Sequence, residues 1–193
     1  MRAYSMLGPV LMMATGAALG EDLTLTVYLQ NMPTADFMTL AAAVGVTAKI
    51  FAGIGVGIRW GSGDPRNTGG ATVAVQFDSA APARFLPDAL GYATPFDDSH
   101  TCIHIFYNRV LGSVAPRTAP ALLGHVMAHE IAHVLERSDR HSATGVMKAQ
   151  WTTGDYDAMA VHPLPFTAED VEAIREYWSG TQVAASSQAR MRQ

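Results

Sequence analysis

The segment HEIAHVLERSDRH, residues 129–141, carries the side chains whose types and spacing are best suited to chemistry. His129 and His133 are four positions apart, so on a helix both imidazoles lie on one face and can bind one metal ion. Glu130 follows about 100° round the helix, within reach of a water molecule held by that ion. The ion would lower the pKa of the water, and the carboxylate would take its proton as the oxygen attacks a carbonyl. The pattern predicts zinc-dependent hydrolysis with Glu130 as the general base.

The alternative for these residues is a polar stripe on a surface helix, with the histidines hydrated. Apolar residues surround them, however, from Val126 to Ala128 on one side and from Ile131 onward on the other. Burying imidazoles and a carboxylate among such residues is costly without a partner, and a metal ion is a suitable partner. His125 lies one turn earlier on the same face. We interpret it as a neighbour of the site, because a fourth protein ligand would exclude water.

Two side chains after the helix can supply the third ligand, Asp139 and His141. A catalytic zinc ion has three protein ligands and one open position. We favour His141, because imidazole suits zinc better than a lone exposed carboxylate, with Asp139 then orienting one of the histidines. Asp139 as the third ligand is the alternative. The expected cofactor is one catalytic Zn²⁺.

HExxH at 129–133, His141 and the directly following SATGVM together resemble the metzincin clan of zinc metallopeptidases, whose signature is HExxHxxGxxH followed by a methionine turn. LGYATPFDDSHTCIHIFYN looks like the clan's edge strand, loop and neighbouring strand, and FTAEDVEAIREYW looks like its C-terminal helix. The resemblance covers residues 21–180. It implies an α+β, zincin/metzincin-like fold with a twisted mixed β-sheet, two long helices, an irregular Met-turn region and a C-terminal helix. It also implies that Met147 is the Met-turn residue under the metal.

The chain departs from the clan's pattern at three points. Glu136 stands at the glycine position, and Asp139 stands at the position of the third histidine. No tyrosine follows Met147 at the short spacing that some members use to stabilise the transition state; Tyr156 could serve there or could simply pack. These departures leave a second hypothesis, a zinc-stabilised, non-catalytic binding protein of the same fold.

The remaining histidines and the single cysteine suggest no second site. His100, Cys102 and His104 alternate on one strand face, which favours a packed or cleft-lining surface over a metal site, because one strand gives poor convergence of ligands. His162 beside Pro163 is typical of a surface loop. Cys102 has no partner for an intramolecular disulfide. It also cannot be an inhibitory propeptide cysteine, since it lies inside the expected catalytic domain.

Composition and charge place the chain among ordinary globular proteins. A length of 193 residues with 49% hydrophobic and 16% charged residues fits one domain with a substantial core. The formal charge of −4 and the lack of a basic run argue against a nucleic-acid partner. We therefore expect a monomer that acts on a peptide or protein substrate.

Residues 1–20 have the pattern of a secretory signal peptide. Arg2 precedes an apolar run from Met6 to Leu19, and Ala18 and Gly20 suit cleavage before Glu21. The run is too short for a stable membrane span. The sequence therefore predicts a secreted or periplasmic protein with no membrane attachment after removal of the signal.

Periodicity predicts a strand–helix–strand–strand opening, a short edge strand, a further strand, a long helix, an irregular region and a last helix. The edge strand would cover the substrate cleft and pair with the substrate backbone. Residues 21–180 form the single metallopeptidase catalytic domain, and residues 181–193 are expected to be a disordered tail. The expected strands are 23–31, 56–60, 71–77, 90–94 and 100–108, and the expected helices are 34–54, 115–137 and 168–178, with the irregular region at 138–166.

Overall fold

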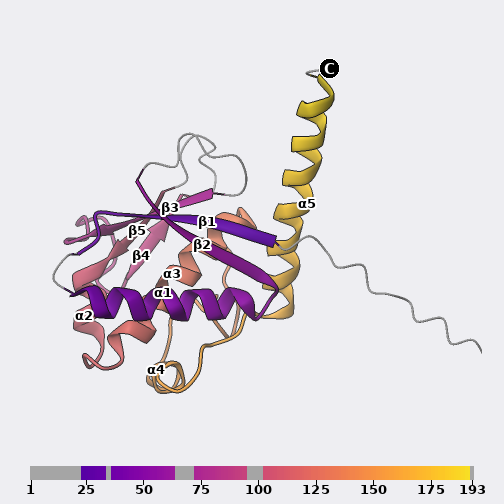
Figure 1. Ribbon diagram of the computed structural model, residues 1–193. Helices are drawn as coiled ribbons and strands as arrows, with labels where there is room; N and C mark the ends of the chain where they lie inside the picture. Colours follow the sequence, from indigo (N-terminus) through magenta and orange to yellow (C-terminus); the bar gives the residue numbers. More distant parts are fainter. Residues whose placement is uncertain (1–22, 34–35, 64–71, 95–101, 192–193) are drawn as a thin grey trace, which may run out of the picture.

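The computed structural model describes residues 23–33, 36–63, 72–94 and 102–191 (Figure 1). The predicted signal segment, residues 1–20, and His100 lie outside the described residues. The strands are β1 Leu23–Gln30, β2 Val56–Ser62, β3 Thr72–Asp78, β4 Gly91–Ala93 and β5 Cys102–Phe106; the helices are α1 Phe37–Ala52, α2 Tyr107–Ser113, α3 Ala119–Glu136, α4 Thr153–Met159 and α5 Ala168–Met191.

The strands form one mixed sheet in the order β2-β1-β3-β5-β4. β1, β2, β3 and β5 run parallel to one another, and β4 pairs antiparallel with β5, with Tyr92 opposite His104. The predicted class is therefore confirmed at its coarser level: a mixed α/β chain with a largely parallel five-stranded sheet, compatible with α+β. The predicted edge strand near 90–94 is also present as β4.

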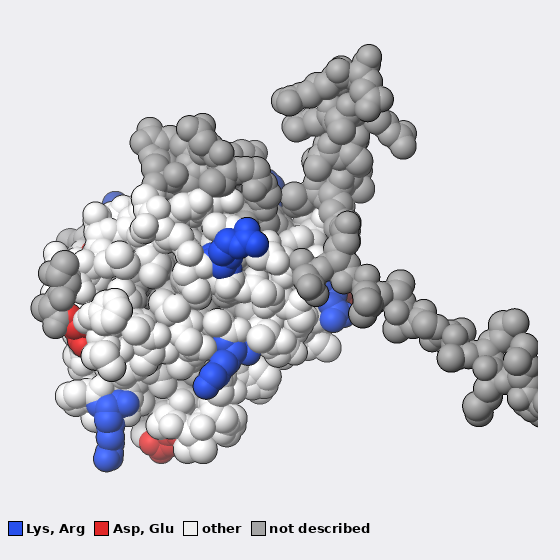
Figure 2. All heavy atoms as spheres, in the orientation of Figure 1, with Lys and Arg blue, Asp and Glu red and all other residues white. Residues whose placement is uncertain are grey.

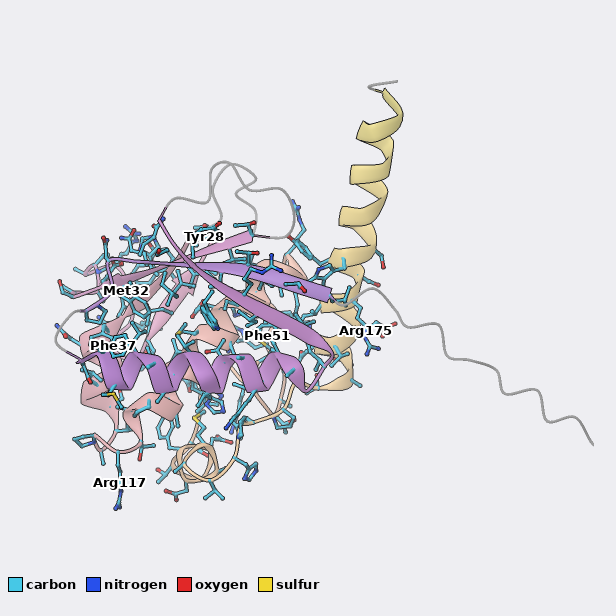
Figure 3. The ribbon with its side chains drawn as sticks, viewed as in Figure 1. Tyr28, Met32, Phe37, Phe51, Arg117 and Arg175 are labelled. Atoms are coloured by element: carbon cyan, nitrogen blue, oxygen red, sulfur yellow. The ribbon has the colours of Figure 1, made fainter. Side chains whose placement is uncertain are left out.

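The hydrophobic core lies between one face of the sheet and the helices α1 and α3 (Figure 1). Side chains alternate along β1, where Leu25, Val27 and Leu29 are buried and the residues between them are partly exposed. On β5, Ile103 and Ile105 are fully buried, as the predicted alternation requires. Phe51 lies on the buried side of α1 and packs against Phe166, with ring centroids 5.2 Å apart (Figure 3).

α3 is the central element of the fold, and α1 crosses it closely at Gly124. An added Cβ at Gly124 would lie 2.6 Å from Val46 Cβ and 2.7 Å from the Ala43 carbonyl oxygen, so only glycine fits there. The buried Thr47 hydroxyl lies 3.0 Å from the carbonyl oxygens of both Ala43 and Gly124 and can donate to either. α3 is thereby fixed against α1 on one side and the sheet on the other.

Two short helices were not predicted from the sequence. α2 begins directly where β5 ends, and its seven residues are too few to show a helical period. α4 lies inside the region predicted to be irregular. A sequence signal for it exists, because Thr152 and Asp155 form a capping box, with each side chain accepting the backbone N–H of the other residue.

The expectation of a disordered tail at 181–193 is wrong for most of that segment, because α5 continues as a helix to Met191. No glycine or proline follows Gly180, and alanine, glutamine, arginine and methionine there all favour helix. The predicted start of α5 is confirmed: the Thr167 N–H donates to Asp170 Oδ2 (2.8 Å), and the Asp170 N–H donates to Thr167 Oγ1 (3.3 Å). The C-terminal half of α5 extends away from the sheet and the other helices (Figure 1).

The surface shows no large charged area on the face drawn in Figure 2. Lysine and arginine side chains are scattered singly there, so the described residues form no continuous basic patch on this face. A search of the described helices finds none with the length and apolar character needed to span a bilayer.

Substituting Gly124 by alanine is expected to lower the free energy of unfolding by about 2 to 3 kcal/mol, because the methyl group would force α1 and α3 apart. Denaturant unfolding of the metal-free protein measures this. The control is Gly45→Ala on the exposed side of α1, where nothing lies within 4 Å and where alanine should stabilise the helix by up to about 1 kcal/mol. Equal effects of the two variants would contradict the close helix crossing.

Candidate metal centre

His129 and His133 lie on one face of α3 and are held by carbonyl groups from the chain that follows the helix. His129 Nδ1 lies 2.9 Å from the Val146 carbonyl oxygen, and His133 Nδ1 lies 2.9 Å from the Ser138 carbonyl oxygen. A carbonyl oxygen can only accept, so both Nδ1 atoms carry the proton. Both neutral rings therefore present an unprotonated Nε2 on the other side.

These two Nε2 atoms face each other at 3.0 Å. With both Nδ1 atoms donating, neither Nε2 has a proton to share, so two lone pairs point at one another unless a cation lies between them. Burial lowers the pKa of His129 to about 3, with His133 adding to the shift, and burial lowers the pKa of His133 to about 4. The pair is thus neutral at physiological pH, and its two Nε2 lone pairs are available to a cation.

His141 completes the group. The ligand atoms of His129, His133 and His141 all lie within 4.8 Å of one another, and the structure does not include Asp139 in this group. Tetrahedral coordination with bonds of 2.0–2.1 Å places nitrogen ligands about 3.3 Å apart, close to the separation of the His129–His133 pair. The three histidines therefore lie close enough to hold a metal ion. Asp139 is an exposed residue of the adjoining cleft.

The segment after His141 turns back under α3 and orients His129. The Ser142 N–H donates to the Met147 carbonyl (2.7 Å), and the Val146 N–H donates to the Pro165 carbonyl (3.0 Å). Gly145 has φ +78°, and an added Cβ would overlap the Pro165 carbonyl oxygen. Met147 is fully buried in the core. The turn therefore places the Val146 carbonyl where the His129 ring can donate to it.

Glu130 projects from α3 toward the edge strand and is only 7% exposed. Burial raises its pKa to about 8. An added Cβ at Gly91 in β4 would lie 3.1 Å from Glu130 Oε1 and 2.8 Å from the His104 carbonyl oxygen, so the absence of a side chain at Gly91 leaves room for the carboxylate. Nearby positive charge would lower the pKa of Glu130.

A cleft of about 710 Å³ opens over this group. Its lining includes Leu90, the strand β4, residues 148–151 and Tyr156 of α4. The size is within the usual range for ligand sites. The cleft therefore gives access to the three histidines and to Glu130 beneath the edge strand.

Trp151, which was not predicted as a supporting residue, and His125, which was predicted as a neighbour of the site, both support the metal centre. Trp151 Nε1 donates to the Gly145 carbonyl (3.2 Å), and its ring meets the His129 ring edge to face at 5.5 Å. His125 is fully buried; its Nδ1 donates to the Ala121 carbonyl (2.7 Å), and its Nε2 accepts the Leu164 N–H (2.9 Å). His125 is thus a structural residue, which supports its interpretation as a neighbour of the site rather than a ligand.

The other candidate residues lie outside the group. His104 Nδ1 lies 2.7 Å from Asp78 Oδ2, and its ring stacks on Tyr92 with centroids 4.5 Å apart, so the His104 side chain is packed. His100 and the Cys102 side chain lie outside the part of the chain that the structure describes. Tyr156 is half-buried in the cleft wall, and burial raises its pKa. His162 is exposed, as predicted. Among the described residues, the three clustered histidines are the one group found to suit a metal ion.

Comparison of the chain with protein-family models and with curated proteins finds no match. Function is therefore inferred from the chemistry of the site itself.

His125→Gln is expected to cost stability most at neutral pH. Burial lowers the pKa of His125 below its ordinary value of 6.5, so the folded state holds fewer protons than the unfolded state. The stability that depends on neutral His125 is present above pH 6.5 and is lost as the pH falls below it. The variant should lose about 1 to 3 kcal/mol at pH 7.5 and less at pH 5.5, measured by denaturant unfolding of metal-free protein. His162→Gln, at an exposed position, should stay close to wild type at both pH values; an equal penalty for His125→Gln at both would contradict the account.

Gly145→Ala should distort the turn that orients His129. A left-handed φ and the contact with Pro165 together make alanine unfavourable by at least about 2 kcal/mol. We expect a lower melting temperature and weaker binding of Zn²⁺, measured by competition with a chromogenic chelator. Gly112→Ala in α2, where nothing lies within 4 Å, is the matched control: it should leave zinc binding unchanged and should not lower the melting temperature, because alanine favours helix. Zinc binding by Gly145→Ala at wild-type strength would argue against this role of the turn.

Proposed function

We propose that the protein is a secreted zinc-dependent peptidase, with His129, His133 and His141 as metal ligands and Glu130 as general base. The observation that carries the proposal is the pair of unprotonated Nε2 atoms 3.0 Å apart, with a third imidazole beside them. Each Nδ1 of the pair is already committed to a carbonyl, so a metal ion is the partner that these lone pairs lack. Three imidazoles suit zinc, and three protein ligands leave a position open for water or substrate.

Zinc, when bound, acts as a Lewis acid and makes water acidic enough to release a proton near neutral pH. The chain supplies the base. Glu130 adjoins the ligand pair on α3, lines the cleft and is almost fully buried. Its pKa of about 8 without metal would fall beside a divalent cation, so the carboxylate becomes ionised and can accept a proton and pass it to a leaving amine.

β4 is suited to bind an extended peptide. Among the described strands it lies at the edge of the sheet, next to β5, and it lines the cleft near Glu130. A substrate backbone could add to it as a further strand, which would align a peptide bond with the base. Together with the antiparallel β4, the buried HExxH helix and the turn at Met147, this supports a metzincin-like fold as part of the proposal.

A zinc-stabilised, non-catalytic binding protein is the second candidate. The departures from the clan's pattern favour it: Glu136 stands at the glycine position, and no tyrosine follows Met147 at the short spacing. Under this hypothesis the metal fastens the segment carrying His141 to α3, and the cleft binds a partner without hydrolysing it.

Glu130→Gln separates the two functions. The amide is nearly the same size as the carboxyl group but cannot accept the proton, so kcat for hydrolysis of a quenched peptide library should fall by about 10²-fold to 10⁴-fold. Zinc content, measured by elemental analysis, should stay near that of wild type, whereas His129→Ala should lose both metal and activity. Hydrolysis by the Glu130→Gln variant at the wild-type rate would rule out Glu130 as the base. A wild-type protein that binds zinc and cleaves no peptide would favour the binding function.

A further inference from the structure

The turn that carries His141 to the site contains no glycine, and side chains fix its shape. α3 ends at Glu136, and Arg137 adopts a left-handed conformation (φ 47°, ψ 43°), which costs a non-glycine residue about 1 kcal/mol. The N–H groups of Arg137 and Ser138 close the helix end on the carbonyls of Val134 and His133, both at 3.2 Å. Beyond Ser138 the chain must be held by other interactions until it reaches the ligand.

Arg140 provides these interactions by joining the turn to both flanking helices. Its Nη2 donates to Asp170 Oδ1 at the start of α5 (2.8 Å) and to Glu136 Oε2 at the end of α3 (3.2 Å), and its Nη1 donates to Ser142 Oγ (3.1 Å). The Glu136 and Asp170 side chains are fully buried, while that of Arg140 is 36% exposed. A planar guanidinium can serve several acceptors at once, which a lysine ammonium cannot reproduce in the same geometry.

Both sequence neighbours of His141 are attached to the same oxygen atom. Asp170 Oδ1 accepts from Arg140 and also from the Ser142 hydroxyl, at 2.6 Å. The other oxygen of Asp170 is fixed by the Thr167 N–H at the start of α5. The backbone on either side of His141 is therefore anchored to one buried carboxylate of α5.

His141 itself is exposed, and its ring contacts in the described structure are with the two other histidines, at centroid distances of 5.3 and 4.9 Å. Its place therefore depends on the backbone that carries it. We propose that Arg140 is a positioning residue: its anchorage to Asp170 and Glu136 holds the turn so that His141 serves as the third metal ligand. This inference rests on the metal centre proposed above.

A purely electrostatic role for Arg140 makes the opposite prediction. Burial lowers the pKa of His133 and of His141, and the positive charge of Arg140 lowers both further. The same charge would repel a bound cation. Removing it should therefore strengthen metal binding if charge alone matters, and weaken metal binding if Arg140 positions His141.

The test measures Zn²⁺ affinity by chelator competition and the visible spectrum of the Co²⁺-substituted protein, which reports the ligand set. Arg140→Lys keeps the positive charge but loses the planar guanidinium that serves several acceptors, and we expect about 10-fold weaker zinc binding. Arg140→Gln should weaken zinc binding by up to about 100-fold. Both should alter the Co²⁺ spectrum. Arg117→Lys, at an outward-pointing arginine before α3, is the control and should match wild type (Figure 3). Circular dichroism checks that each metal-free variant is folded.

A double-variant cycle shows whether Arg140 acts through His141. In the His141→Ala background, Arg140→Lys should weaken zinc binding no further, because the ligand that it positions is gone. Additive losses, unchanged affinity in Arg140→Lys, or stronger binding in Arg140→Gln would each overturn the inference. If Arg140→Gln does not fold, the Lys variant and Ser142→Ala, for which a several-fold loss is expected, decide the question. A wild-type protein that binds no zinc would instead overturn the proposed function.

Discussion

The two hydrogen bonds from imidazole Nδ1 to backbone carbonyl are the constraint on which the site depends. The His129 bond reaches Val146, and the His133 bond reaches Ser138, so each of these two histidines of α3 is fixed to a loop that follows the helix. The bonds fix which nitrogen carries the proton, and they therefore fix which nitrogen is free to bind a metal. Each hydrogen bond gives a loop carbonyl a donor and at the same time orients the imidazole ring.

The rest of the fold keeps these bonds in place. α3 is buried along nearly its whole length, held against α1 at Gly124 and against the sheet by its apolar face. Below the site, Trp151 and His125 connect the helix to the segments that carry Gly145 and Leu164. Because these partners are themselves paired, the Nε2 atoms of His129 and His133 are held in place, and a metal ion bound there would find them preorganised.

Local patterns in the sequence predicted the parts of the structure that depend on local physics. The spacing of His129 and His133 placed both on one helix face, alternation on β5 identified the core-facing Ile103 and Ile105, and Thr167 and Asp170 marked the start of α5. Interactions between distant segments gave no comparable signal. The Arg140–Asp170 ion pair joins residues 30 positions apart, and the room that Gly91 leaves for Glu130 depends on how the edge strand meets α3. α2 and α4 were too short to show a period, although the capping box of α4 was readable.

The electrostatics of the centre follow from the neutral state of His129 and His133 at physiological pH. The Nε2 lone pairs of His129 and His133 converge, and without a cation between them they repel each other. Glu130 is buried with a pKa of about 8, so its ionised form is unfavourable when no metal is bound. A divalent cation would relieve both together, since it accepts the lone pairs and stabilises the ionised carboxylate. Under the proposed function, then, the same ion that completes the ligand set also converts Glu130 into a base. Metal binding and catalytic competence would therefore arise in one step, which is why the position of His141 matters to both.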